Sequence, residues 1–269
     1  MTATGQSYES YLADLSAYPI GEVLPRAKWD SYPSSVAAAV LLSLDQAVAR
    51  TAQARDLAER IALLSPTGVP VAVLAAPGDE AGFRDASAAL AEAALVTYTS
   101  GGLVVMHRLT ARVIRDHAAA EGTLQDTASG VVARVDEVLG AHNFGLAWRD
   151  REDIAVLHRQ VEALGETAPD GLRPALCRLR VRRQSYLVAV HDLEQAVRTG
   201  LSSAAECAEV FGADHPETLA TRNNLAFCLR AAGREQEARV MFAALLADCE
   251  RALGPGHPMS AKVRDDIEG

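Results

Sequence analysis

Apolar residues recur at spacings of three and four along much of the chain, which places them on one face of an α-helix. Within residues 35–50 this spacing holds for Val36, Val40, Leu41, Leu44 and Val48. The same spacing predicts helices at residues 52–64, 83–95 and 107–120. Residues 69–74 predict a short helix with a proline in its first turn. The pattern therefore predicts a mainly α fold.

One short segment has a different pattern. Residues 95–99 and 103–106 are β-prone, and Ser100-Gly101-Gly102 lies between them. Two such runs joined by a Gly-Gly turn predict a β-hairpin. Three helices, this two-stranded wing and one more helix together predict a winged-helix-like domain.

The C-terminal part contains an internal repeat. The segment Phe211-Gly212-Ala213-Asp214-His215-Pro216 recurs further along the chain as Leu253-Gly254-Pro255-Gly256-His257-Pro258. Periods of this size, about 42 residues, are typical of stacked supersecondary units. Leu225 and Leu229 share one helix face, Gly233 allows a tight turn, and Ala238 and Phe242 follow on a second helix. This order predicts an antiparallel helical hairpin and, with its copies, an α-α superhelix.

These patterns divide the chain into four predicted parts. They are an N-terminal helical segment at 1–33, the winged-helix-like domain at 34–121, connecting helices at 122–170, and helical repeats at 171–269. The last part holds about two and a half hairpins, and each hairpin buries its apolar face only against a neighbour. The open face near Asp265-Asp266-Ile267 is therefore expected to be covered by upstream helices, by self-association or by a partner.

The repeat resembles the tetratricopeptide family, in the variety found in kinesin light chains. The residues that carry the resemblance are Asp214 to Leu219, Asn223 to Ala226, Gly233, Glu237 and Ala238. In the copy before it, Arg183 and His191 stand where Leu225 and Gly233 would be expected. The resemblance implies a concave surface that holds an extended peptide or a partner helix.

Residues 7–120 resemble the winged-helix end of bacterial STAND-type (NB-ARC-like) signalling ATPases. The motifs are Tyr32-Pro33-Ser34-Ser35-Val36, Leu63-Leu64-Ser65-Pro66, Val69-Pro70 and Val105-Met106-His107-Arg108-Leu109. The resemblance implies that His107 could sense the phosphates of a nucleotide. The alternative is that His107 simply begins the following helix.

Enzyme motifs are missing from the sequence. The two lysines, Lys28 and Lys262, do not follow a phosphate-binding Gly-x-x-x-x-Gly loop, and there is no Gly-x-Ser-x-Gly, His-Glu-x-x-His or Gly-x-Gly-x-x-Gly motif. We therefore predict no enzyme, no catalytic residues and no cofactor. The four cysteines have neither the spacing nor the histidines of a zinc site, so no metal is predicted, and they are expected to be buried in helix packing.

Charge and composition limit the partners. The net charge of −9 opposes a general attraction to nucleic acid or anionic lipid. The helix at 83–95, which would enter a DNA groove, has few base-reading side chains, so DNA is not the expected partner. No apolar stretch is long enough to span a bilayer. The sequence therefore predicts a cytoplasmic protein that does not bind a membrane. The basic cluster Arg173, Arg178, Arg180, Arg182 and Arg183 is interpreted as a solvated helix face, with an anionic peptide or RNA contact as the alternative.

The predicted partner-binding residues lie on the first helix of the best repeat. Ala220, Asn223, Phe227 and Arg230 are spaced three and four apart, away from the face of Leu225 and Leu229. Asn223 could hydrogen-bond a peptide backbone, Arg230 could pair with a carboxylate, and Phe227 could supply apolar area. The alternative is an ordinary solvated face.

Together these features predict a non-enzymatic protein–protein interaction adaptor or regulatory protein in bacterial signalling. Two alternatives remain open at the level of sequence. One is a nucleotide-sensing accessory chain of a split STAND ATPase switch, acting through His107. The other is a winged-helix transcription regulator.

Overall fold

The computed structural model describes residues 36–141 and 151–268. The N-terminal helical segment predicted at 1–33 lies outside the described residues. The chain divides into two compact units, the first made of residues 1–131 and 166–168 and the second of residues 132–165 and 169–269. The boundary between the units falls inside helix α8 (Leu124–Ala141). Each unit is described separately below.

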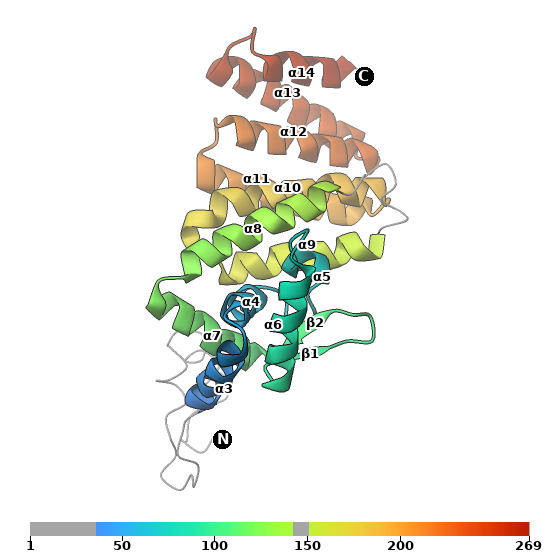
Figure 1. Cartoon of the computed structure of the whole chain (residues 1–269). Helices are drawn as coiled ribbons and strands as arrows, with labels where there is room; N and C mark the ends of the chain where they lie inside the picture. Colours follow the sequence, from blue (N-terminus) through green and yellow to red (C-terminus); the bar gives the residue numbers. More distant parts are fainter. Residues whose placement is uncertain (1–35, 142–150, 269) are drawn as a thin grey trace, which may run out of the picture. The chain divides into compact units, whose positions relative to one another are not determined.

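The first unit is helical with one small sheet (Figure 1). Its elements are α3 (Val36–Arg50), α4 (Gln53–Ala62), α5 (Val71–Leu74), α6 (Glu80–Glu92), β1 (Val96–Tyr98), β2 (Val104–Met106), α7 (Arg108–Glu121) and the first part of α8. The core is aliphatic. Leu44, Ile61, Leu90 and Ile114 come from four different helices and are almost fully buried.

The predicted hairpin is confirmed. Strands β1 and β2 are antiparallel, with Val96 opposite Met106. The predicted helix at 69–74 begins later, at Val71, because Val69 pairs with Val104 as an isolated β-bridge. A residue before proline avoids the helical region, so Val69 is extended and Pro70 precedes the helix instead of lying in its first turn.

The second unit consists of helices that follow one another along the chain (Figure 1). They are the second part of α8, α9 (Arg151–Thr167), the short 3-10 helix η2 (Asp170–Leu172), α10 (Arg173–Ala189), α11 (Leu193–Phe211), α12 (Pro216–Ala231), α13 (Glu235–Leu253) and α14 (Pro258–Glu268). Helix α12 packs against both α11 and α13, and α13 packs against α14. The mainly helical fold ending in helical hairpins is thus confirmed.

The period read from the sequence is kept by the helix boundaries. Helices α11 and α13 begin at Leu193 and Glu235, one repeat period apart. Pro174, Pro216 and Pro258 lie at the same interval in the first turns of α10, α12 and α14. The helix starts within the predicted repeat part therefore follow the period read from the sequence.

The repeated helix starts use the same local bonds. His215 and His257 each accept a hydrogen bond at Nδ1 from the backbone N–H two residues later, at 3.1 Å. Thr218 and Ser260 each donate a side-chain hydrogen bond to the carbonyl of the glycine that ends the previous helix, at 2.8 Å. These bonds satisfy backbone groups that a helix end leaves without a partner.

The turns inside the hairpins also match. Gly233 has a φ of 74°, and His191, its equivalent one repeat earlier, has a φ of 60°. Positive φ angles of this size are energetically costly for residues other than glycine. His191 thus adopts the backbone conformation that the repeat requires.

Candidate functional site

The four residues predicted to bind a partner lie on α12, on the side that faces α14. Asn223 is only 1% exposed, whereas Ala220, Phe227 and Arg230 are half-buried. Their shared face is therefore covered in part by the chain's own last helix. Whether they bind a partner stays a prediction.

Asp266 of α14 is the main contact of this face. Asn223 donates its side-chain amide to Asp266 Oδ2 at 3.0 Å, and Arg230 donates to the Asp266 carbonyl at 2.8 Å. Lys262, one turn earlier on α14, pairs with the Asp266 carboxylate at 3.5 Å. Asn223 and Arg230 thus hold α14 against α12, and Asn223 is engaged inside the chain.

Phe227 is the aromatic centre of the same face. Its ring meets Phe242 of α13 edge-on at 5.5 Å, and Arg230 lies over it at 4.7 Å from the centroid. Lys262 approaches the same ring at 5.7 Å. A cation over an aromatic ring contributes about 0.5 to 2 kcal/mol and keeps its charge available. The arrangement can therefore offer apolar area and two cationic groups at once.

The sequence predicted Asp266 only as part of an open face to be covered and did not predict Lys262 here, although a signal was present. Lys262 and Asp266 are four residues apart, which on a helix is the spacing of an ion pair. That Lys262 and Asp266 lie next to α12 could not be predicted, because it depends on how α14 packs. That packing is a tertiary property.

The basic cluster on α10 differs from the predicted solvated face. Arg178 is exposed and pairs with Glu217 of α12, and Arg180, Arg182 and Arg183 also pair with acidic residues of other helices. Arg180 binds Glu206 of α11, Arg182 binds Asp136 of α8, and Arg183 binds Glu162 of α9. The cluster thus connects helices of the second unit, because its arginines surround α10 instead of following one side of it.

His107 is exposed and begins helix α7. Its Nδ1 accepts a hydrogen bond from the backbone N–H of Leu109 at 3.2 Å, as His215 and His257 do in the repeats. This contact matches the alternative in which His107 starts the following helix. The nucleotide role implied by the STAND resemblance stays a prediction.

The hydrogen bond between His107 and the start of α7 should contribute measurably to stability. We expect His107→Ala to lower the stability of the first unit by about 0.5 to 2 kcal/mol, because it leaves a helix N–H without an acceptor. His107→Asn should keep most of the stability, since asparagine is a good cap. The measurement is chemical denaturation of the intact chain, with hydrogen exchange of α7 as the local readout. Equal stability of all three proteins would contradict the capping role.

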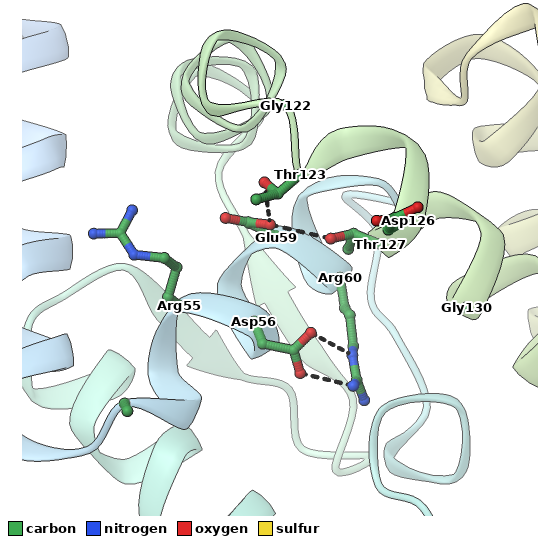
Figure 2. A pocket seen from close by; sticks show the side chains of 10 residues that line it. Arg55, Asp56, Glu59, Arg60, Gly122, Thr123, Asp126, Thr127 and Gly130 are labelled. Carbon is green, nitrogen blue, oxygen red and sulfur yellow. Dashed lines mark hydrogen bonds and ion pairs between the residues drawn. The ribbon is translucent and has the colours of Figure 1, made fainter.

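A cleft of about 520 Å³ lies elsewhere in the first unit, beside α4 and the turn between α7 and α8 (Figure 2). At its base Glu59 is 6% exposed and accepts hydrogen bonds from Thr123 and Thr127 at 2.9 and 3.1 Å. Beside it Asp56 pairs with Arg60. His107 does not line this cleft. The buried carboxylate fastens α4 to the beginning of α8, where a negative charge is favourable.

Within 36–141 and 151–268 no group of three His, Cys, Asp or Glu side chains could hold a metal ion. The four cysteines are buried, as expected, and Cys177 and Cys207 place their sulfurs 2.8 Å apart. Burial raises the pKa of the Cys228 thiol to about 11, which keeps it protonated and unreactive at neutral pH. None of the helices in the described ranges is long and apolar enough to cross a membrane.

Two-helix units that recur at a constant interval define a protein of the helical-hairpin repeat class. A tetratricopeptide repeat family model matches residues 218–258, which extend from α12 through α13 to the start of α14. The comparison with curated proteins found no match. The tetratricopeptide-type repeat is thereby confirmed, whereas the STAND-type resemblance and the winged-helix assignment stay predictions.

Proposed function

We propose that this chain is a non-enzymatic adaptor or regulatory protein in bacterial signalling, which binds a peptide or a helix of a partner protein through its tetratricopeptide repeats. The observation that carries the proposal is the tetratricopeptide match at residues 218–258, because repeats of this kind are typically protein-interaction modules. The contacts on α12 and α14 suggest where the partner binds and which chemistry it has.

The proposed binding surface is named the α12–α14 face and comprises Ala220, Phe227, Arg230 and Lys262. Lys262 is exposed, and Ala220, Phe227 and Arg230 are half-buried. Asn223 supports this face from beneath through its bond to Asp266. In this proposal Asn223 positions α14 and does not itself contact the partner.

The charge of the face favours an acidic partner. Arg230 and Lys262 both lie near the Phe227 ring. Arg178, at the position of Ala220 one repeat earlier, is also exposed, but its charge is paired with Glu217. A segment that combines carboxylates with an apolar side chain would pair with the cations and cover the ring.

The test is a selection of displayed random peptides on the intact chain, repeated on the variant Arg230→Glu/Lys262→Glu. We expect the wild-type chain to enrich peptides that join acidic and apolar residues, and we expect the variant to lose them. The matched control is Arg239→Glu, which reverses an exposed arginine on α13 that pairs only locally with Glu235. The proposal fails if no peptide is enriched, or if wild-type and double variant enrich the same peptides.

A further inference from the structure

The hairpin formed by α10 and α11 departs from the repeat pattern in its interior. In α13 the residues Met241, Phe242 and Leu245 are apolar, and Phe242 and Leu245 are buried. At the equivalent positions, one repeat earlier, α11 carries Thr199, Gly200 and Ser203. Thr199 is 8% exposed and Ser203 is 2% exposed, so polar and small side chains replace a hydrophobic contact.

The first helix of the same hairpin, α10, also carries polar residues where the later repeat has apolar ones. Arg183 and Gln184 of α10 occupy the positions of Leu225 and Ala226 in α12. Gln184 is fully buried and neither atom of its side-chain amide has a hydrogen-bond partner. Buried polar groups without partners cost about 1 to 3 kcal/mol each, so a cluster of them in a core is typical of a functional site.

Three of these residues, Arg183, Thr199 and Ser203, line a polar cleft of about 350 Å³ between α9, α10 and α11, here named the arginine cleft. Its lining includes Arg180, Arg183, Arg198, Thr199, Ser203 and Glu162. In the part of the chain that the structure describes, the hydroxyls of Thr199 and Ser203 form no hydrogen bond, and Nε of Arg180 is buried without a hydrogen-bond acceptor. The hydroxyls of two nearly buried residues are thus available to a ligand, and Arg180 Nε has only a long ion pair, 3.9 Å from Glu162 Oε2.

The cleft contains more hydrogen-bond donors than acceptors. Three guanidinium groups face two carboxylates, since Arg180 pairs with Glu206 at 2.5 Å and Arg183 pairs with Glu162 at 2.7 Å. Each guanidinium has five N–H donors, of which these pairs use only part. The third guanidinium, that of Arg198, is exposed and pairs with Glu194 outside the lining at 3.7 Å. The cleft therefore has a surplus of hydrogen-bond donors.

We propose that the arginine cleft binds a small oxyanion, a carboxylate or a phosphate group, through Arg180, Arg183 and the hydroxyls of Thr199 and Ser203. Arginine suits planar and tetrahedral oxyanions because two parallel N–H groups can bind two oxygens at once. The volume accommodates a small anion or the acidic group of a larger ligand. The site lies on another side of α10 from the residues equivalent to the α12–α14 face, so it does not depend on the proposed function.

The repeat itself supplies variants that should remove the site without removing the fold. Arg183→Leu and Ser203→Leu each introduce the residue that stands at the equivalent buried position in α12 and α13. Arg239→Leu is the matched control, because it removes an exposed arginine outside the cleft. Circular dichroism and thermal unfolding verify that each variant is folded.

The experiment is isothermal titration of the intact chain with inorganic phosphate and, separately, with succinate, at low ionic strength. We expect one of the two anions to bind saturably to the wild-type chain and to the Arg239→Leu control, and to bind at least tenfold more weakly to Arg183→Leu and Ser203→Leu. The anion that binds more tightly identifies the group as phosphate or carboxylate. Absence of binding by both anions, or equal binding to all four proteins, would overturn the proposal.

Discussion

Replacing His158 with phenylalanine is expected to stabilise the second unit and to remove much of its sensitivity to acid. His158 of α9 is 4% exposed, and neither ring nitrogen has a hydrogen-bond partner. Burial, and next the positive charge of Arg183, lower the pKa of His158 to about 3. The equivalent residue two repeats later is Phe242, so an aromatic ring without nitrogens fits the pattern.

The direction of the pH dependence follows from proton binding. Above about pH 6.5 the imidazole is neutral in the folded and in the unfolded chain, and it adds no pH dependence. Between about pH 6.5 and about pH 3 the unfolded chain binds a proton that the folded chain does not bind, so the free energy of unfolding falls as the pH falls. At about 1.4 kcal/mol per pKa unit, the loss over this interval reaches roughly 4 to 5 kcal/mol.

The measurement is urea unfolding of the intact chain at several pH values, with hydrogen exchange of α9 and α10 as the local readout. At about pH 7.5 His158→Phe should raise stability by about 1 to 2 kcal/mol, because two buried nitrogens without partners are removed. The advantage over wild type should grow as the pH decreases. His158→Gln, which has no proton to bind, is the control for the pH effect alone. Parallel pH profiles for wild type and His158→Phe would contradict the interpretation.

The second large effect is expected at Gly200, where even one methyl group should destabilise the fold. A Cβ at this position would lie 2.3 Å from the amide nitrogen of Gln184 and 2.8 Å from Leu225 Cδ1. Overpacking of this kind costs about 1 to 3 kcal/mol, although alanine is otherwise the better helix residue. An alanine on α11 at this position would therefore require the buried Gln184 side chain of α10 and the Leu225 side chain of α12 to shift.

A double-mutant cycle with Gln184 tests this contact. Gln184 and Gly200 stand where the other repeat has Ala226 and Phe242, so a large residue on one helix faces a small one on the other in both copies. We expect Gly200→Ala to cost at least about 1 kcal/mol less in the Gln184→Ala background than in wild type. The comparison uses the free energy of unfolding of the four proteins in urea.

Gly130 provides the control for this cycle. It lies inside α8, and a Cβ there would meet nothing within 4 Å. Gly130→Ala should therefore stabilise the chain by about 0.5 to 1 kcal/mol, through helix propensity alone. If both alanine substitutions had the same sign, crowding at Gly200 would not be the cause.

The α12–α14 face illustrates how far sequence reasoning reached. The spacing of Ala220, Asn223, Phe227 and Arg230 correctly grouped them on one side of a helix, since that depends only on the helical repeat. It did not reveal that α14 covers Asn223. Whether a helix face meets solvent, a neighbour or a partner depends on packing between segments as far apart in the chain as Asn223 and Asp266.

The sequence by itself predicted the hairpin, most helices of the first unit and the repetition of the C-terminal part. Periodic apolar residues, a Gly-Gly turn and a regular repeat interval are local signals, and the backbone follows them through short-range sterics and hydrogen bonds. Only the tertiary structure decided that His158 and Gln184 are buried without partners and that Thr199 and Ser203 share a cleft with Arg183. The physical reason is that burial and complementarity of size arise between helices, where residues distant in the chain compete for the same space.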